Sequence, residues 1–285
     1  MITGKTLITG VIGHPIEHSF SPPMHNNAYK LMNMDYKYVP FHVQPENIEH
    51  VIIAAKTLNI QGLNVTIPYK TEIIPYLDQI DETARKINAV NTISFKDGIA
   101  KGYNTDGMGA VKSIKEYTSL KDKNVLVIGA GGASKAITFT LINEDINTLT
   151  IANRSKDNAS KLISNLRNQT NFMNISYQDI KDTNEIISEM DIIINTTPIG
   201  MYPNHNVEPP IEVNNIVAEQ TVMDIIYNPL ETELLKQAKL RGAQTIPGTK
   251  MLINQGITAF EIFTGKTPSY ESFEEPLLAS LKKQQ

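Results

Sequence analysis

Residues 125–134, Val-Leu-Val-Ile-Gly-Ala-Gly-Gly-Ala-Ser, are the stretch that decides the fold of this chain. The apolar residues at its start are typical of a buried strand, and residues 133–144 after its glycines have the pattern of a helix. In such a strand–turn–helix the backbone N–H groups can approach a pyrophosphate at the positive end of the helix dipole. The stretch therefore predicts a dinucleotide-binding loop. The alternative is a glycine turn with a structural role only.

The third glycine position of the dinucleotide-binding fingerprint is occupied by Ser134, so the bare pattern is imperfect. The surrounding sequence strengthens it, because short apolar runs alternate with amphipathic stretches. Strands are predicted at residues 124–128, 148–152, 191–195 and 221–224, and helices at 133–144, 156–166, 183–189 and 231–240. Strands separated by helices of this length imply right-handed crossovers and a parallel sheet. We therefore predict an α/β fold with a doubly wound, Rossmann-type domain over residues 107–246.

The end of the second predicted strand of this domain indicates which dinucleotide binds. Asn153, Arg154 and Ser155 lie about 20 residues past the glycine loop, where an NAD site would carry Asp or Glu. Arg154 and Ser155 are instead suited to a 2′-phosphate, the guanidinium through a charge-assisted hydrogen bond. The sequence therefore predicts NADP as the cofactor. The alternative is that Ser155 caps a helix and Arg154 is solvated.

The first part of the chain, residues 1–106, is predicted to be a separate α/β substrate-binding domain. A strand is expected at residues 7–12, a helix with Ser21 as its N-cap and Pro22 in its first turn, and a further helix around residues 48–58. A strand at 89–95 is followed by Asp97-Gly98, a hairpin signal. Helices predicted at 250–263 and 273–281 lie in the terminal segment 247–285, which we expect to pack back on this first domain.

Residues 62–70, Gly-Leu-Asn-Val-Thr-Ile-Pro-Tyr-Lys, alternate polar and apolar side chains. This alternation predicts a strand with Asn64 and Thr66 on one face, and Pro68 stops strand pairing just before Lys70. One short segment thus offers two hydrogen-bonding groups in line with a cation. The alternative is an edge strand with a solvated polar face.

Composition excludes several classes of function. A chain of 285 residues suggests two domains, and its 41% apolar and 20% charged residues are ordinary for a globular protein. The net charge of −4 indicates neither nucleic acid nor an anionic membrane surface as a partner. Without cysteine there is no disulfide, thiolate nucleophile or cysteine-bound metal. No signal peptide or membrane-spanning run is visible, so we predict a cytoplasmic protein.

The histidines near the N-terminus do not predict a metal site. His14, His18 and His25 are joined by no acidic cluster at ligand spacing except Glu17, and Ser21-Pro22 already explains the segment as a helix start. We therefore expect no metal.

Several motifs in order give the chain a family resemblance. They are Gly13–Pro22 (GHPIEHSFSP), Asn64–Lys70, Asn88–Thr92 (NAVNT), Gly102–Gly107 (GYNTDG), the glycine loop, Asn195–Met201 (NTTPIGM), Asp224–Pro229 (DIIYNP), Gly248–Met251 (GTKM) and Gln255-Gly256. Together they resemble the shikimate dehydrogenase family, and the resemblance runs from Val11 to the C-terminal helices. It implies an NADPH-dependent, reversible reduction of 3-dehydroshikimate to shikimate in aromatic amino-acid biosynthesis, with the active site in the cleft between two domains.

The resemblance also implies roles for individual residues. Ser19 and Ser21 would bind the substrate carboxylate, with Tyr227 nearby. The ring hydroxyls and the reacting oxygen would be held by Asn64, Thr66, Lys70, Asn91, Asp106 and Gln255. The dinucleotide would be lined by Gly129, Ala130, Gly131, Gly132, Ala133, Asn153, Arg154, Ser155, Ile225 and Gly248, and more weakly by Glu82.

The chemistry of the predicted catalytic pair fits this reaction. A hydride arriving at a ketone carbon leaves an alkoxide, which a cationic donor stabilises as the charge develops. Lys70 can stabilise and protonate that oxygen, but a lysine pKa of about 10.4 calls for a well-placed partner, for which Asp106 is the natural choice. Opposite charges ~4 Å apart in a cleft interact by roughly 4 kcal/mol before desolvation. Whether Lys70 alone or the pair transfers the proton stays open, as does a purely structural Lys–Asp bridge.

Two departures from the family pattern and three other functions remain. Asn88 stands where the family commonly has glycine, and Lys156 is the nearest extra cation where many relatives carry a second arginine near Asn158, which would weaken the NADP preference. The alternatives are a quinate/shikimate dehydrogenase using NAD or both cofactors, a non-catalytic dinucleotide sensor, and a methylenetetrahydrofolate dehydrogenase. The paired serines and residues 104–107 argue against the last. The protein could be a monomer or a homodimer.

Overall fold

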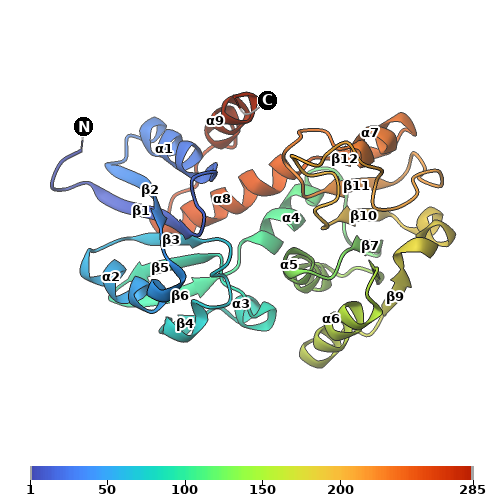
Figure 1. The fold of residues 1–285 in the computed structure, drawn as a ribbon, viewed down its shortest axis with the longest axis horizontal. Helices are drawn as coiled ribbons and strands as arrows, with labels where there is room; N and C mark the ends of the chain where they lie inside the picture. The colour runs from blue at the N-terminus through green and yellow to red at the C-terminus, as the bar shows by residue number, and fades with distance from the viewer. Residues whose placement is uncertain (1, 284–285) are drawn as a thin grey trace. The chain divides into compact units, whose positions relative to one another are not determined.

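The computed structural model describes residues 2–283 and divides the chain into two compact units (Figure 1). The first unit comprises Met1–Thr105 and Ile253–Gln285, and the second comprises Asp106–Leu252. Each unit is built around its own six-stranded sheet. None of the helices described in residues 2–283 combines the length and apolar character that crossing a bilayer requires.

The second unit is a doubly wound parallel sheet. Its strands run in the order β12-β11-β10-β7-β8-β9, and every neighbouring pair is parallel. The bounds are β7 (Asn124–Ile128), β8 (Thr148–Asn153), β9 (Ile175–Asp179), β10 (Ile192–Asn195), β11 (Thr221–Asp224) and β12 (Gln244–Ile246), with α4 (Asp106–Lys115), α5 (Gly132–Leu141), α6 (Lys156–Gln169) and α7 (Glu233–Leu240). The strand order reverses between β7 and β10, the position where such sheets bind ligands. The predicted fold class is confirmed.

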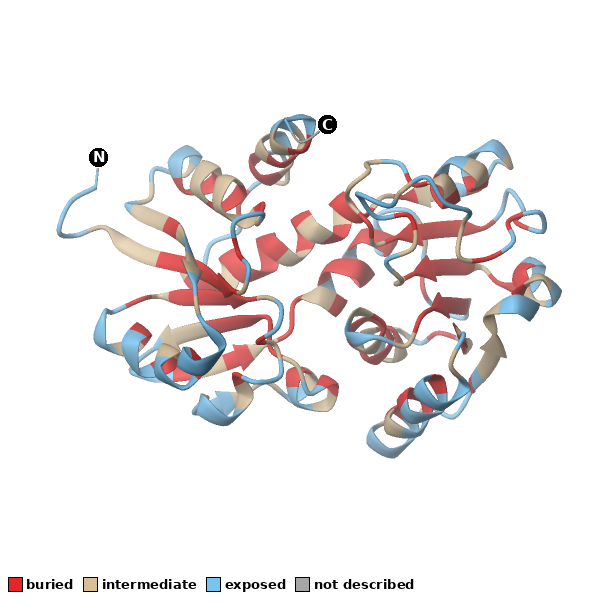
Figure 2. Ribbon diagram, viewed as in Figure 1, coloured by how far each residue is buried: buried red, intermediate tan, exposed pale blue. Residues whose placement is uncertain are grey.

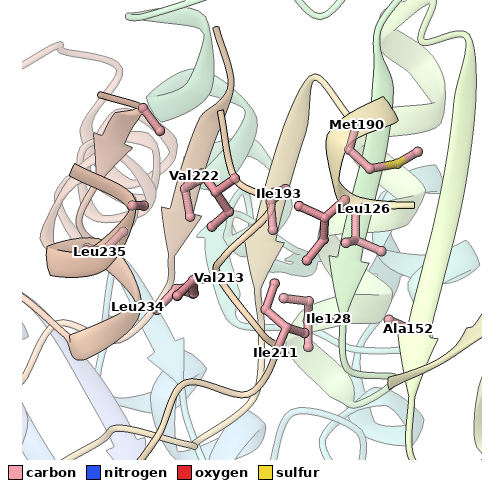
Figure 3. Packing of buried hydrophobic residues seen from close by; sticks show 14 residues of the cluster. Leu126, Ile128, Ala152, Met190, Ile193, Ile211, Val213, Val222, Leu234 and Leu235 are labelled. Atoms are coloured by element: carbon pink, nitrogen blue, oxygen red, sulfur yellow. The ribbon is translucent and has the colours of Figure 1, made fainter. Parts of the chain in front are cut away.

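Strand alternation builds the core of this unit. Figure 3 shows Leu126, Ile128, Ile193 and Val222, from three adjacent strands, facing Leu234 and Leu235 of α7. Because side chains alternate along a strand, the intervening residues of the same strands belong to the opposite face, where α5 packs on β7 and α6 on β8. Both faces are therefore covered, and in Figure 2 the strands of this sheet are mostly coloured as buried.

The first unit contains a mixed sheet in the order β2-β1-β3-β5-β6-β4. The bounds are β1 (Leu7–Gly13), β2 (Tyr36–His42), β3 (Gly62–Val65), β4 (Gln79–Ile80), β5 (Thr92–Lys96) and β6 (Ile99–Tyr103). Asp97 and Gly98 both have positive φ, 52° and 76°, and turn β5 into the antiparallel β6 as the hairpin signal predicts. The helices are α1 (Ser21–Leu31), α2 (Val51–Thr57), α3 (Glu82–Ile87), α8 (Gly248–Thr264, in this unit from Ile253) and α9 (Glu271–Lys282).

Two sets of buried side chains cover the two faces of this sheet. On one face, Ile12, Leu63 and Ile93 cluster with Ile52 and Ala55 of α2. A second, aromatic set surrounds His25 of α1, whose ring stacks on Tyr38 at 4.2 Å and lies 5.0 Å from the ring of Phe273 in α9. The helix α9 therefore closes the same layer as α1, against which it packs.

The structure corrects the prediction for residues 62–70. The strand β3 ends at Val65 and lies between β1 and β5, so the alternative of a solvated edge strand is wrong. After Val65 the chain turns, and Tyr69 N–H donates to Thr66 O at 2.9 Å. Pro68 cannot donate to a strand neighbour, which explains why the alternation continues in the sequence while the strand does not.

Two further predictions need correction. Residues 183–189 are not an α-helix but belong to 3-10 turns at Ile180–Glu185 and Ile187–Glu189, separated at Ile186, whose φ is −117°. Ser21 is the first residue of α1 rather than its N-cap, and its N–H donates to Ser19 Oγ at 3.3 Å. Local hydrogen bonds of short polar side chains compete with regular helix geometry at both places.

Candidate dinucleotide and substrate sites

The glycine loop forms a tight turn between β7 and α5. Gly129 has φ +108°, and a Cβ at this position would lie 2.6 Å from Thr196 Oγ1. Gly131 is the N-cap of α5 and Gly132 its first residue, and a Cβ at either would meet nothing within 4 Å. Open space thus lies beside the N-terminus of a ten-residue helix, which is the arrangement that receives a phosphate.

Ser134 lies on the buried side of this loop and hydrogen-bonds to its backbone. Its side chain is fully buried and its Oγ donates to Gly129 O at 2.8 Å. The hydroxyl ties the first turn of α5 to the end of β7, at the fingerprint position where glycine or alanine is usual. The departure noted in the sequence therefore adds a hydrogen bond without filling the space in front of the loop.

Asn153, Arg154, Ser155 and Asn158 line a cavity of about 350 Å³ at the end of β8. Ser155 is the N-cap of α6, and its Oγ accepts a hydrogen bond from Asn158 N–H at 3.3 Å. Asn153 Nδ2 donates to Ser155 O at 2.8 Å and fixes the turn, while Arg154 is exposed. The capping role of Ser155, one of the two alternatives, is therefore present, and it orders the backbone beside the cavity.

In the first unit, buried amides and hydroxyls form one hydrogen-bond network. Asn64, 8% exposed, accepts from the Tyr38 hydroxyl at 2.7 Å and donates through Nδ2 to Thr92 Oγ1 at 3.0 Å. Burial raises the pKa of Tyr38 well above its usual value, with the charge of Tyr29 adding to the effect and a hydrogen bond from Ser21 opposing it. Tyr38 therefore stays a hydroxyl that links Ser21 to Asn64.

The same network continues through Asn91, which is 3% exposed. Asn91 Oδ1 accepts from Thr105 N–H at 2.8 Å and from Thr92 Oγ1 at 3.0 Å, and Asn91 Nδ2 donates to Thr105 Oγ1 at 3.0 Å. Thr105 Oγ1 lies 3.4 Å from Gln255 Oε1 of α8. The structure thus brings together Ser21, Asn64, Asn91 and Gln255, all predicted substrate-binding residues.

Tyr38, Thr92 and Thr105 are members of this network that sequence reasoning missed. Thr92 lies directly opposite Asn64 in the antiparallel β3–β5 pair, and Tyr38 lies on β2, two strands away from β3. No spacing along the chain indicates these neighbours. For Tyr38 and Thr92 the signal is the sheet order, which the sequence does not contain, whereas Thr105 follows β6 within the motif 102–107.

The predicted catalytic residues lie in different units. Lys70 is half-buried in the first unit, and its backbone oxygen accepts from Val90 N–H at 2.7 Å, next to Asn91. Asp106 is the first residue of α4 in the second unit. Their pairing stays a prediction.

The other predicted residues are placed as follows. Ser19 is half-buried, and Thr66 directly follows β3, with its N–H donating to Ile12 O at 3.0 Å. Gly248 packs on the backbone oxygen of Ile225, where a Cβ would lie at 2.3 Å, so these two predicted cofactor residues are neighbours. Burial raises the pKa of Tyr227, which keeps its hydroxyl.

Glu82 has a local partner instead. Its carboxylate forms an ion pair with Lys86 Nζ at 2.7 Å, one helical turn on, and the Lys86 hydrogen bond lowers its pKa. An exposed pair of this kind is explained within α3 alone.

The histidines are separated by the fold. His14 Nδ1 hydrogen-bonds His42 Nε2 at 2.7 Å near the surface, whereas burial lowers the pKa of His25 to about 3 and keeps it neutral. Within residues 2–283, no group of three or more His, Asp or Glu side chains is arranged to hold a metal ion.

One unit has a doubly wound sheet with a glycine loop, and the other carries a buried network of amides and hydroxyls; together they define a dinucleotide-binding protein of two α/β units. Residues 11–93 match the family model of the shikimate dehydrogenase substrate binding domain, 110–225 that of shikimate / quinate 5-dehydrogenase, and 248–278 that of the shikimate 5′-dehydrogenase C-terminal domain. The chain belongs to the shikimate dehydrogenase family.

Individual relatives cover the whole chain. A protein of Methanosphaera stadtmanae named shikimate dehydrogenase (NADP(+)) is 77% identical over 99% of this chain and all of its own. A crystal structure of a shikimate dehydrogenase in complex with NADP+ is 46% identical with a TM-score of 0.91, covering 99% of this chain and 98% of that one. The ligand-free 5-ketofructose reductase of a Gluconobacter strain is 32% identical with a TM-score of 0.92, covering 97% and 99%.

Proposed function

We propose that this chain is an enzyme that catalyses the NADP-dependent, reversible reduction of 3-dehydroshikimate to shikimate, a step of aromatic amino-acid biosynthesis. The observation that carries the proposal is the 77% identity, from end to end, to a relative named for this activity. The quinate, sensor and folate alternatives are not favoured by it. The glycine loop and the buried polar network provide the two kinds of site that the reaction needs.

NADP is the proposed cofactor because of the cavity at the end of β8. Arg154 and the N-terminus of α6 would both present positive charge to an anion in this cavity, and its lining residues include no acid. The 2′-phosphate of NADP matches this surface, whereas the ribose of NAD calls for an acceptor that the lining residues do not include. When bound, the reduced cofactor would supply the hydride, and the oxidised cofactor would accept it in the reverse direction.

The first unit is proposed to bind the substrate through neutral groups. Ser19 and Ser21 would donate to the carboxylate, and Asn64, Thr66, Asn91 and Gln255 would hold the ring hydroxyls. The hydrogen bonds among Tyr38, Asn64, Thr92 and Asn91 support this proposal, because they fix which atoms of the amides donate and which accept. Sites of this type reject analogues that lack a hydroxyl by ~10⁴ or more in favourable cases.

Lys70 and Asp106 are the proposed catalytic residues. The ammonium would stabilise and protonate the oxygen that becomes negative when hydride arrives, and the carboxylate would orient the ammonium. The proposed domains are 1–106 with 247–285 for substrate and 107–246 for NADP. Tyr227 beside the substrate, Glu82 near the cofactor, a cytoplasmic location and the choice between monomer and homodimer likewise remain proposals.

Initial rates test the proposal. Purified protein is assayed for oxidation of shikimate, quinate and the alcohol corresponding to 5-ketofructose, each with NADP and with NAD. We expect shikimate with NADP to give the highest kcat/KM. A higher kcat/KM with quinate and NAD would favour a quinate dehydrogenase. A higher kcat/KM with the alcohol formed by reducing 5-ketofructose would favour a 5-ketofructose reductase. NADP binding without turnover of any substrate would favour a sensor.

A further inference from the structure

Asp224 is a carboxyl group buried at the end of β11, and the proposed function gives it no role. Its side chain is 0% exposed and accepts three hydrogen bonds. The donors are Asn195 Nδ2 at 3.1 Å, Ile226 N–H at 3.1 Å and Thr232 Oγ1 at 2.7 Å. All three donors are neutral, and no salt bridge within residues 2–283 includes Asp224. A buried carboxyl without a cation is unusual and calls for a reason.

Asn195 extends the arrangement to the neighbouring strand. It ends β10 directly opposite Asp224 in the parallel pair and is also 0% exposed. While its Nδ2 donates to Asp224, its Oδ1 accepts from the N–H and the Oγ1 of Thr197, at 2.9 Å and 2.8 Å. The loop after β10 and the loop after β11 are therefore joined through two side chains.

The loops joined in this way lie beside the proposed dinucleotide site. Thr196, next to Asn195, donates through Oγ1 to Ile128 O at 2.7 Å and is the residue that a Cβ on Gly129 would strike. Ile225, next to Asp224, is the residue on whose backbone Gly248 packs. The carboxyl ends of parallel strands are where such sheets bind their ligands.

The hydrogen-bond donors around Asp224 favour its charged form, whereas burial opposes it. A carboxylate only accepts hydrogen bonds, and three donors point at this one, whereas a protonated acid would set its own O–H against one of them. Burial raises the pKa of Asp224 to about 6, against the opposing effect of its hydrogen bonds. Because the folded-state pKa lies above the unfolded one, the group stabilises the fold most at low pH, and that stabilisation is lost as the pH rises through about 6. At neutral pH the charged form is therefore held at a cost in stability.

We propose that Asp224 is a positioning residue, whose carboxylate holds the loops 196–200 and 225–232 in the arrangement that receives the dinucleotide. This inference rests on the proposed function, which places NADP beside these loops. A residue kept only for stability would not need a charge here, since apolar side chains in place of the carboxyl and its side-chain donors would avoid the cost of burying the charge.

A pair of variants separates positioning from stability. Asp224→Asn keeps the shape and removes the charge. Asp191→Asn is the matched control, because Asp191 lies at the opposite ends of the strands of the same sheet, where it pairs with Lys123 Nζ at 2.8 Å and accepts from Asn124 N–H at 2.8 Å. Partial burial alone would raise the Asp191 pKa, but these two hydrogen bonds lower it overall, so Asp191 stabilises the fold at neutral pH.

The measurements are the NADP dissociation constant by calorimetry, kcat and KM for both substrates, and the unfolding temperature. For Asp224→Asn we expect NADP to bind at least ~10-fold more weakly, as for loss of a charge-assisted hydrogen bond, together with a lower unfolding temperature, because the amide N–H2 replaces one acceptor oxygen and faces a donor. For Asp191→Asn we expect a lower unfolding temperature and unchanged NADP affinity. If Asp224→Asn unfolds at a lower temperature but binds NADP and turns over substrate like the wild type, the inference is overturned.

Thr232 provides a second test that does not depend on changing the carboxyl. Thr232→Val removes the donor to Asp224, and Thr232→Ser retains it together with the cap of α7. We expect weaker NADP binding for the valine variant and recovery for the serine variant, and equal NADP affinity in both would count against positioning. Wild-type protein that binds NADP but does not oxidise shikimate would refute the proposed function, and the affinity comparison would still decide the role of Asp224.

Discussion

Two glycines of the same loop should respond to alanine in opposite ways. Gly129 needs its glycine for the fold, because φ is +108° and a Cβ would lie 2.6 Å from Thr196 Oγ1. The fold does not require glycine at position 132, since Gly132 is the first residue of α5 and a Cβ there meets nothing within 4 Å. If the open space beside Gly132 receives the pyrophosphate, alanine at that position should obstruct NADP only.

The magnitudes follow from these contacts. For Gly129→Ala, the backbone conformation alone costs about 1–3 kcal/mol, and the Thr196 hydroxyl must move in addition. For Gly132→Ala, the helix gains about 0.4–1 kcal/mol, because alanine loses less conformational entropy on folding. The added methyl in a close-fitting site costs roughly 1–3 kcal/mol of binding, which is about a 5- to 150-fold weaker NADP complex.

Thermal unfolding and NADP titration check both values on the same samples. Gly4→Ala is the control, since a Cβ there also meets nothing within 4 Å and Gly4 lies in the first unit. We expect Gly129→Ala to unfold earlier, Gly132→Ala to unfold no earlier but to bind NADP weakly, and Gly4→Ala to behave as the wild type. If Gly132→Ala binds NADP as tightly as Gly4→Ala does, the phosphate does not approach this helix terminus and the reasoning fails.

Three further predictions concern single residues. Arg154→Ala should weaken NADP by ~10-fold or more while leaving NAD almost unchanged, as measured by competition titration; parallel weakening of both would refute the 2′-phosphate assignment. Lys70→Ala should lower kcat for shikimate by about 10²–10⁴ with the NADP dissociation constant unchanged, and an equal loss of cofactor affinity would show that Lys70 is structural. Burial lowers the pKa of His25 to about 3, so its neutral form contributes to the stability of the fold above pH ~6.5. As the pH falls toward 3, up to about 4–5 kcal/mol of the free energy of unfolding is lost. Urea unfolding at pH 7 and pH 4.5 measures the first part of this loss, about 2.7 kcal/mol over two pH units, and His25→Phe should reduce it.

The sequence predicts most of the second unit because its signals are local. Each of the strands β7, β8, β10 and β11 is an apolar run, and the turn chemistry sits directly after β7 and β8. Elements of weaker pattern, among them β9 and β12, were not predicted. They are the two edge strands of the sheet, and pairing with one neighbour rather than apolar character places them there.

The first unit shows where local reasoning ends. The alternation in residues 62–70 correctly marks Asn64 as polar beside an apolar face, but it does not reveal that β3 lies in the middle of the sheet. A polar face in the middle of a sheet is stable only if its groups find partners, and Tyr38 and Thr92 provide them from other strands. Strand order, which the local pattern does not contain, therefore turns a surface-like pattern into a buried site.

The departure at Asn88 illustrates how the structure resolves a doubt that the sequence raises. Asn88 has φ 55° and ends α3 in the left-handed conformation, which glycine adopts most easily and which asparagine tolerates better than most residues. The turn it makes leads to Val90, whose N–H donates to Lys70 O at 2.7 Å, and so to the buried amide of Asn91. Replacing glycine with asparagine thus keeps the backbone conformation that the turn requires. Because that conformation, rather than the side chain, delivers Asn91 to its hydrogen-bond partners, the departure gives no reason to expect a differently built site.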